Sequence, residues 1–520
     1  MHNIEVTAKT EEKLNFAILP VIVIGTFMAV MDGTIVNVSL PKMISVFNSS
    51  TSAAQWIVTA YMLTLGIVMP ISGYLGDRFG YKRVYFTALL VFVIGSFLCG
   101  AAWSINSLVA FQVFQALGGG IMQPLGMAIL YQNFPREKMG MVLGIWGISM
   151  TLAPAIGPTL GGYLVDYLSW RLIFFINVPV GIVNLFMAQA RLKETPLIKE
   201  HNLDVVGIIT SAIGFFCLLL AISEGNNYGW TSPYIVVLLF VAAFTLTIFI
   251  YNELHHDEPI MDLRLCKNYV FSISLVVSSI ISIGMFAVVF LIPLLLQSIL
   301  GKTAVLTGLI LFPAALASGV VMPLAGRIFD RYGARSLVMG GVVVLIITTY
   351  MLHGINAMTP VSVIVFWLVM RGFGMGFAFM PSTTAGMNTV PPHLVGRASA
   401  LNNVIRQIAS ALGISMFTSI FTSRQSIYLA DLAANINVSS NEYLNLQSEI
   451  MSIATSLGIS GDSVFGLTGS MMMQKAVKES MVMAMGDCFI VAAGLTVIAL
   501  VLAAFFKGRQ NIPDNKHNAN

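Results

Sequence analysis

The sequence predicts an all-α polytopic membrane protein with fourteen transmembrane helices in two related halves. Of its 520 residues, 57% are hydrophobic and only 10% are charged, and the mean hydropathy is +0.85. A soluble domain does not carry this balance. The apolar runs reach the roughly 20 residues that a helix needs to cross the hydrocarbon core. A third observation, a repeated turn, predicts the two halves.

The repeated turn occurs at residues 73–83 (GYLGDRFGYKR) and again at 326–335 (GRIFDRYGAR). Each copy ends one apolar run and begins another, so we expect two short basic hairpins between membrane helices. Asp77 and Asp330 are 253 positions apart, whereas six spans with their loops need only about 200 residues. The surplus predicts two helices inserted between the halves, from about residue 204 to 253.

The predicted spans divide the chain in order. They begin near residues 16, 53, 84, 106, 139, 172, 205, 232, 270, 304, 336, 361, 397 and 480. We expect a short N-terminus (1–15), a six-helix half (16–190), a linker (191–204), the inserted pair (205–253), a second linker (254–269), a second half (270–506) and a tail (507–520). The second half contains a long outer segment, 423–478, with helix-like stretches at 426–435 and 441–457. This segment either covers the outer mouth or is a solvated connector.

The positive charges predict the orientation. Most of the 27 lysines and arginines fall in segments that face the cytoplasm when the N-terminus lies inside, as the positive-inside rule requires. We therefore expect a multi-pass protein of a bacterial cell membrane with both termini cytoplasmic. The first apolar run is too long for a signal peptide and contains Asp32, so we interpret it as a retained helix.

The sequence contains no pattern for catalysis or for a cofactor. Its four cysteines are scattered, which is typical of neither a disulfide framework nor a metal site. We find no catalytic triad and no complete phosphate-binding loop. We therefore expect no enzyme activity, no cofactor, no metal and no nucleic-acid partner.

Several stretches resemble a known family, in the right order and over nearly the whole chain. They are residues 31–41 (MDGTIVNVSLP), 55–61 (QWIVTAY), 73–83, 157–162 (GPTLGG), 170–179 (WRLIFFINVP) and 398–407 (ASALNNVIRQ). Together they resemble the fourteen-helix drug:proton antiporter branch of the major facilitator superfamily, the EmrB/QacA type. The resemblance implies the major facilitator fold, with two six-helix halves plus the two inserted central helices. It also implies alternating access and multidrug efflux driven by inward-moving protons.

The hairpins are candidate gates. Small residues such as Gly73 let two helices approach closely, and Asp77 can face the positive N-terminal end of a neighbouring helix. The resemblance implies that the hairpin holds the outward-facing state together. In the second copy Phe329 replaces the second glycine, so we expect a weaker latch there. The predicted hairpin gating residues are Gly73, Asp77, Arg78, Arg83 and Asp330.

A second candidate gating element is the segment 147–162. Its glycines and prolines are spaced for close packing and a bend within one helix, and in the related transporters it is the antiporter motif. We assign gating roles to Pro154, Gly157, Pro158 and Gly161. For any single glycine, close packing alone is the alternative.

Asp32 is the candidate proton carrier. An ionised aspartate at the centre of a membrane helix costs about 2.5 to 3.5 kcal/mol, so the neutral form is favoured. Gln112 lies at a comparable depth, at a position where the related family usually has arginine. Either Gln112 alone contacts the carboxyl, or Arg371 or Arg406 supplies the missing cation. For each arginine the alternative is a buried structural pair or a carbonyl clamp.

The predicted substrate cavity combines flexible and aromatic residues. Methionines suit an adaptable apolar cavity, although lipid-facing positions are the alternative. Aromatic rings attract cations, although Trp56 equally suits an interfacial anchor. The candidate cavity residues are Met31, Asn37, Trp56, Tyr61, Met122 and Met150.

We therefore expect proton-coupled efflux of small amphipathic or cationic drugs across the membrane. The partners are the proton, the substrate and the lipid bilayer, and whether an adaptor protein takes part is left open. One alternative is a dedicated exporter of one metabolite, antibiotic or lipid. A non-transporting membrane sensor is a further alternative, against which the doubled hairpin argues.

Overall fold

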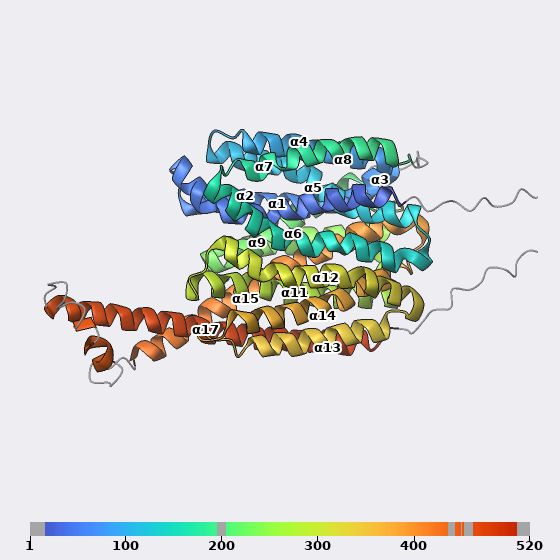
Figure 1. Cartoon of the computed structure of the whole chain (residues 1–520). Helices are drawn as coiled ribbons and strands as arrows, with labels where there is room; N and C mark the ends of the chain where they lie inside the picture. The colour runs from blue at the N-terminus through green and yellow to red at the C-terminus, as the bar shows by residue number, and fades with distance from the viewer. Residues whose placement is uncertain (1–15, 195–203, 435–442, 449, 452–460, 507–520) are drawn as a thin grey trace, which may run out of the picture.

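The computed structural model describes residues 16–194, 204–434, 443–448, 450–451 and 461–506. Fourteen helices in these ranges are long and apolar enough to cross a membrane, and they stand side by side in one bundle (Figure 1). The described residues form helices and connections, with no strand among them. This confirms the predicted all-α membrane fold.

The first half contains six spans. They are α1 (Ile18–Phe47); α2 (Thr51–Val68) continued by η1 (Met69–Ile71) and α3 (Ser72–Phe79); α4 (Tyr81–Gly100); α5 (Ile105–Asn133); η2 (Arg136–Lys138) with α6 (Met139–Tyr167); and α7 (Leu172–Phe175) with α8 (Asn177–Arg191). Hydroxyl groups start two of the helices: the Ser50 side chain accepts from the Ala53 amide, and Ser104 forms a capping box with Ser107. Pro70 has no amide hydrogen to donate, and α2 ends next to it.

The second half repeats this plan. It contains η3 (Leu263–Lys267), α11 (Tyr269–Leu294) with the π-helical η4 (Leu295–Ile299), α12 (Ala304–Tyr332), α13 (Arg335–Leu352), α14 (Val361–Met387), η5 (Pro392–Leu394) with α15 (Val395–Ala434), and α17 (Gly461–Ala503). Along one seam between the halves, α6 packs against α12.

The inserted pair is α9 (Val205–Tyr228) and α10 (Pro233–His255). Helix α9 contacts both α2 of the first half and α15 of the second half, so the pair bridges a seam between them. Two carboxylates form hydrogen bonds at the end of the pair where α9 begins and α10 ends. Asp204 accepts from the Gly207 amide at 2.7 Å, and buried Glu253 accepts from the Met261 amide at 2.9 Å.

We call the end of the bundle where α1 begins and α17 ends the terminal end, and the opposite end the distal end. Helices α15 and α17 project together past the distal end (Figure 1). The last helix begins at Gly461, so it extends well before the start of the membrane span expected near residue 480. Hydropathy indicates only the apolar part of the helix that crosses the bilayer. The more polar residues before that part belong to the same helix.

The described part of the long outer segment consists largely of these helical extensions. Residues 426–434 continue α15, and residues 443–448 are helical. Of the two predicted stretches, residues 435, 441–442, 449 and 452–457 lie outside the described part. The extensions project away from the bundle (Figure 1), so these helices do not fold back over the distal end as a cover.

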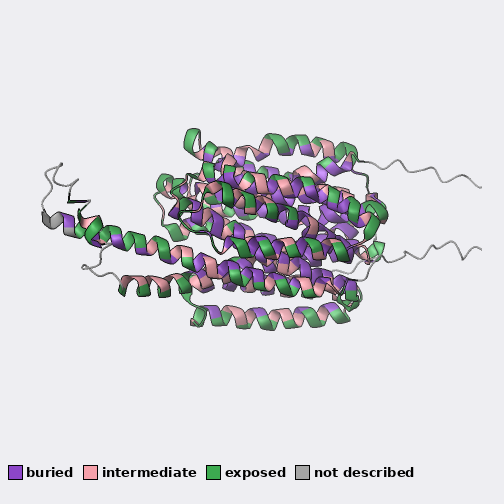
Figure 2. Ribbon diagram, turned by 60° about the horizontal axis from the view of Figure 1, so that its bottom comes forward, coloured by how far each residue is buried: buried purple, intermediate pink, exposed green. Residues whose placement is uncertain are grey.

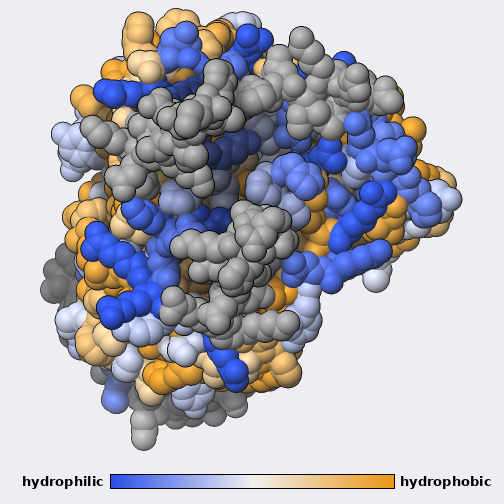
Figure 3. Space-filling view, turned by 90° about the vertical axis from the view of Figure 1, so that its right-hand side faces the viewer, coloured by the Kyte–Doolittle hydropathy of each residue, from blue (hydrophilic) through white to orange (hydrophobic). Residues whose placement is uncertain are grey.

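Burial follows the membrane environment. Buried residues fill the interior of the bundle, and exposed residues lie along its flanks (Figure 2). The flanks carry large apolar side chains such as Phe186 and Phe240, which are 73% and 72% exposed. Seen from the terminal end, hydrophilic residues occupy much of the described end surface and hydrophobic residues lie around it (Figure 3). An apolar belt between polar ends is the pattern that a bilayer requires.

Candidate functional site: a central cavity and a separate buried carboxylate

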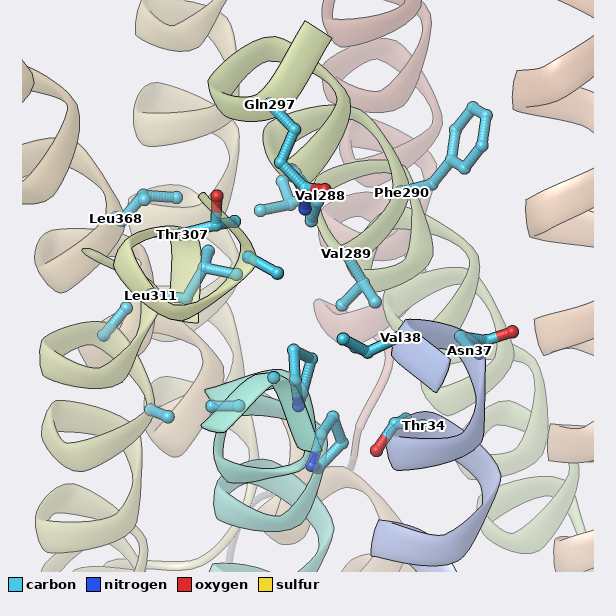
Figure 4. A pocket seen from close by; sticks show the side chains of 18 of the residues that line it. Thr34, Asn37, Val38, Val288, Val289, Phe290, Gln297, Thr307, Leu311 and Leu368 are labelled. Atoms are coloured by element: carbon cyan, nitrogen blue, oxygen red, sulfur yellow. The ribbon is translucent and has the colours of Figure 1, made fainter. Parts of the chain in front are cut away.

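A cavity of about 970 Å³ lies between the two halves, in the distal part of the bundle. Its lining comes from α1 and α6 of the first half and from α11, η4, α12 and α14 of the second half. Thr34 and Val38 of α1, Val288 and Val289 of α11 and Thr307 and Leu311 of α12 surround one space (Figure 4). A largely apolar lining with a few polar groups is typical of a small-molecule site.

Only three side chains among the described lining residues carry a charge. Lys42 and Asp166 are exposed and lie near the distal ends of α1 and α6. Arg371, in contrast, is buried, and it lies ten residues into α14 from the distal start of that helix. At about 1.5 Å per residue this places it near mid-membrane. Arg371 is therefore the one deep charge among the described residues of the cavity wall.

Two hydrogen bonds hold Arg371. One terminal nitrogen donates to the Thr349 hydroxyl of α13 at 2.7 Å, and the other donates to the Gly284 carbonyl of α11 at 2.8 Å. In the described part of the chain Arg371 forms no ion pair with a carboxylate. The carbonyl clamp that the sequence left open is thus present, and the same side chain also faces the cavity.

Asp32 lies apart from the cavity, inside the first half. Its Oδ1 accepts from the Gln115 amide at 2.9 Å and from the Asn177 amide at 3.1 Å. Both amides also donate to the Ser96 hydroxyl, each at 3.2 Å. The Cys99 thiol donates to the Gln115 carbonyl oxygen at 3.4 Å, which aims the amide nitrogen at the carboxylate.

The second carboxylate oxygen of Asp32 is free. Asp32 is only 1% exposed, and its Oδ2 has no hydrogen-bond partner among the described residues. A proton on Oδ2 would leave both amide bonds to Oδ1 intact. The arrangement can therefore accept and release a proton without rebuilding its hydrogen-bond network.

The glutamine beside Asp32 is Gln115 rather than Gln112, which corrects the contact expected from the sequence. Gln112 is also buried, but its carbonyl oxygen has no partner in the described structure. The two residues are three positions apart on α5, about 4.5 Å in depth and less than one turn, so the estimate of depth from the sequence did not distinguish them. Neither Arg371 nor Arg406 contacts Asp32: Arg406 donates to Gln123 at 3.2 Å and to Asn403 at 2.6 Å.

We expect Gln115→Leu to slow proton-coupled transport about tenfold or more, because a hydrogen bond to a charged group contributes about 1.5 to 3 kcal/mol. Gln112→Leu, on the same helix, is the matched control and should change the rate little. The measurement is substrate-driven proton flux in proteoliposomes. Equal losses in both variants would contradict the assignment of Gln115.

The first hairpin fastens α3 to the start of α15. The Arg397 Nε lies 3.6 Å from Asp77 Oδ2, with both side chains buried, and the Tyr81 hydroxyl donates to Asp77 Oδ1 at 2.7 Å. A Cβ atom on Gly73 would lie 2.7 Å from the Gly396 backbone. Glycine is therefore required for this close approach at the terminal end.

The second hairpin fastens α12 to the start of α6. The two Asp330 oxygens accept from the backbone amides of Gly140 at 2.8 Å and Met141 at 3.1 Å. These amides belong to the first turn of α6, where a carboxylate is stabilised by the helix dipole. Each hairpin thus joins its own half to the opposite one.

Further hydrogen bonds close the terminal end. Arg136, beside α6, donates to the Asn388 carbonyl at 2.7 Å and also to the Val390 carbonyl, and Tyr131 donates to the Asn388 side chain at 3.1 Å. All three connect the first half to the end of α14. The structure is therefore sealed between the halves at the terminal end and hollow toward the distal end.

The contact between Gly140 and Gly326 gives a direct test of this seal. A Cβ atom on Gly326 would lie 2.0 Å from the Gly140 carbonyl oxygen. Gly326→Val should therefore force α6 and α12 apart and destabilise the sealed state by about 1 to 3 kcal/mol. The measurement is maleimide labelling of a cysteine at buried Met139, after replacement of the exposed Cys266.

The matched control for this experiment is Gly340→Val on α13, where an added Cβ would meet nothing within 4 Å. Labelling at Met139 should accelerate in Gly326→Val and stay at the parent rate in Gly340→Val. A parent-like rate in both variants would show that the α6–α12 contact is not part of the seal.

The segment 147–162 forms part of a continuous α6 and has two distinct faces. Pro154 and Pro158 line the cavity. Gly157 and Gly161 face α1, and a Cβ on them would lie 2.5 Å from Thr34 and 2.7 Å from Ile35, respectively. The prolines therefore shape the cavity, and the glycines permit close packing of α6 on α1.

The two remaining hairpin arginines lie on the terminal end. Arg78 donates to the Tyr74 hydroxyl at 2.5 Å and stacks over the Tyr74 and Phe79 rings. Arg83 forms an ion pair with Glu194 at 3.2 Å, in which the Arg83 side chain is 68% exposed. Exposed pairs of this kind contribute little to stability.

Of the six predicted cavity residues, only Asn37 lines the cavity. Met31, Met122 and Met150 are buried in the apolar core, because a flexible methionine fills interior gaps as readily as cavity walls. Tyr61 is buried and donates to the Ala29 carbonyl at 3.0 Å. Trp56 is 39% exposed near the distal start of α2, as an interfacial anchor would be.

The sequence reasoning assigned no role to several residues of these sites. They are Ser96, Cys99, Gln115, Asn177, Tyr81 and Arg397. A signal was present for Ser96 and Asn177, because each is a polar residue within an apolar run. No local signal paired Arg397 with Asp77, since the two residues belong to opposite halves.

Comparisons with known proteins agree with this architecture. The family described as "Major Facilitator Superfamily" matches residues 22–414. The multidrug export protein EmrB of Escherichia coli K12 is 30% identical over 93% of this chain and 94% of its own length. The lincomycin resistance protein LmrB of Listeria innocua is 30% identical over 78% of this chain and 86% of its own length. The YhcA transporter of Bacillus subtilis, itself uncharacterized, is 33% identical over 96% of this chain and 94% of its own length.

Solved structures share the fold at low sequence identity. The human organic anion transporter MFSD10 has a TM-score of 0.61 at 12% identity, covering 95% of this chain and 100% of that chain. The proton:xylose symporter XylE has a TM-score of 0.58 at 13% identity, covering 95% of this chain and 99% of that chain.

The fold and the site define a multi-pass membrane transporter, with two halves around a central cavity and a seal at one end. The chain belongs to the major facilitator superfamily.

Proposed function

We propose that this protein exports drugs from a bacterial cell by proton-coupled alternating access, with the terminal end in the cytoplasm. The single observation that carries the proposal is the separation of two sites. A buried carboxylate with one free oxygen, Asp32, lies outside a cavity that is sealed toward the terminal end. The relatives named for multidrug export and for lincomycin resistance support drugs as the cargo.

In this mechanism the two halves, residues 16–190 and 270–506, move against each other around the cavity. The inserted pair, residues 205–253, bridges the seam between α2 and α15 during this movement. Compounds enter when the hairpin latches open and leave through the distal end when the latches close. Protons move in the opposite direction and are carried by Asp32.

Helix α1 connects the two sites mechanically. Asp32 faces α5 and α8, whereas Thr34 and Asn37 on the same helix line the cavity. Protonation of Asp32 changes its attraction to the two amides, which biases the position of α1. The same bias acts on the cavity wall, and through Gly157 and Gly161 it acts on α6.

The test is transport by inside-out vesicles that contain the purified protein. An imposed proton gradient, acidic inside, should drive uptake of compounds from a panel of amphipathic drugs. Uptake of each transported compound should be accompanied by release of protons from the vesicle lumen. A panel without transport would contradict drug export. Transport of one compound alone would support the dedicated exporter, the second candidate.

A further inference from the structure

The cavity wall contains a buried cation without a counter-ion. Arg371 is 8% exposed, and no carboxylate of the described structure lies within ion-pair distance of it. The two charges at the rim, Lys42 and Asp166, are exposed to solvent. The deep part of the cavity is therefore positive. A charge held within the membrane is expensive unless it is paired, and a bound anion would supply the missing partner.

The hydrogen bonds of Arg371 leave donors available. A guanidinium carries five N–H donors, and two terminal nitrogens each make one hydrogen bond, to Thr349 and to Gly284. These two bonds fix the plane of the group from the α13 and α11 sides. A fixed planar fork with free donors is the geometry that binds a carboxylate with high specificity.

A second, independent polar group in the wall also lacks a partner. Thr307 of α12 is 1% exposed, and its hydroxyl has no hydrogen-bond partner among the described residues. Thr307 lies at the wall of the cavity (Figure 4), and Arg371 lines the same cavity. An unpaired buried hydroxyl costs free energy that a bound polar ligand would recover.

We propose that Arg371 binds an acidic group of the transported compound, so that the cavity prefers amphipathic organic anions over cations of the same shape. Thr307 supplies a further hydrogen bond to the polar part of the cargo. Asp32 does not offset this preference, because it lies outside the cavity wall and its contacts are neutral amides. This inference rests on the export function proposed above and narrows its cargo to acidic amphipathic compounds, in place of the amphipathic or cationic drugs expected from the sequence.

The experiment uses three probes that share one fluorescent body: pyrenebutyric acid, its uncharged carboxamide and pyrenebutylamine. Binding to the full-length protein in lipid nanodiscs is measured for each probe by fluorescence anisotropy. The wild type should bind the acid about tenfold or more tightly than the carboxamide, and the amine most weakly. Arg371→Gln should remove the advantage of the acid, and Arg371→Lys should restore part of it.

The matched control is Arg424→Gln, which removes an arginine from the distal extension of α15, where it pairs with Asp487 at 3.3 Å outside the cavity. It should keep the wild-type order of the three probes. Thermal unfolding of each variant separates loss of binding from loss of folding. Should Arg371→Gln unfold, Thr307→Val supplies the alternative test, with weaker binding of the acid and the carboxamide expected.

Two results would overturn the inference. One is equal binding of the acid and the amine by the wild type, and the other is an unchanged preference for the acid in folded Arg371→Gln. In either case export of other drugs by vesicles would still stand. Conversely, charge-selective binding without any transport would refute the export function and leave the anion site in place.

Discussion

Proteoliposomes containing an Asp32→Asn variant should show no substrate-driven proton movement above the leak of empty vesicles. The same variant should still carry substrate down its own concentration gradient. The expected effect is large, because Asp32 is the one described carboxylate that is almost fully buried, free at one oxygen and held by neutral amides in the interior of the first half.

The chemical reason is that asparagine keeps the size and the acceptor of Asp32 but cannot bind a proton reversibly. Its carbonyl oxygen can still accept from Gln115 and Asn177, so the hydrogen bonds to Oδ1 are preserved. The substitution therefore imitates the protonated state and removes the cycle between the two states. Coupled uptake against a gradient should disappear, whereas conformational exchange should persist.

The control is Asp32→Glu, which retains the carboxyl group and should retain measurable coupling. Far-ultraviolet circular dichroism and thermal unfolding should be close to the wild type for Asp32→Asn. Normal proton flux in a correctly folded Asp32→Asn protein would eliminate Asp32 as the carrier and direct attention to another buried acid, such as Glu253.

The fold was predictable because the composition and the length of an apolar run together indicate a membrane-spanning helix. A run of apolar residues of sufficient length has one stable solution in lipid, a helix, and the spacing of Asp77 and Asp330 indicated the inserted pair. The start of α17 at Gly461 was not predictable in this way. A helix that continues into water loses its apolar signal while it keeps its backbone hydrogen bonds.

The site was less predictable because it depends on which side of each helix faces which neighbour. Gln112 and Gln115 differ by less than one turn of α5, and only packing against α1 and α4 selects Gln115. The same limit applies to Met122 and Met150, which packing places in the core. Residues tied to backbone chemistry, such as Asp330 at a helix start, were easier to interpret.

The Asp77 latch should be the stronger of the two gates, and its removal should open the terminal end. Removing one partner of a buried ion pair costs about 3 to 5 kcal/mol, because the other charge stays buried and unpaired. The Asp77 and Arg397 side chains are 7% and 8% exposed, respectively. Asp77→Asn therefore removes one partner of a buried ion pair. Such a change shifts a two-state equilibrium by a factor of about one hundred or more.

The Asp330 latch should be weaker for a different reason from the one that the sequence suggested. Asp330 accepts two backbone amides at the start of α6, and a charge at a helix terminus contributes about 0.3 to 2 kcal/mol. Asparagine at this position keeps one acceptor. Asp330→Asn should therefore open the terminal end less than Asp77→Asn does.

The distance between the halves reports both effects. Spin labels at the exposed Ala190 of α8 and Ser336 of α13 lie at the terminal end on opposite halves. Pulsed electron paramagnetic resonance should show a label-to-label distance in Asp77→Asn that is longer than in the parent protein. In Asp330→Asn the same longer distance should be less populated than in Asp77→Asn. The parent protein carries Cys266→Ser, since the other cysteines are buried.

A double-mutant cycle separates a real ion pair from two independent contributions. Arg397→Gln alone should open the terminal end as Asp77→Asn does, because it removes the buried cation that faces the Asp77 carboxylate. In the double variant neither charge remains, and replacing both members of a buried pair is often close to neutral. The double variant should thus open less than either single variant. Opening that instead equals the sum of the two single effects would show that Asp77 and Arg397 act separately, and the latch would then depend on close backbone packing at Gly73 and Gly396.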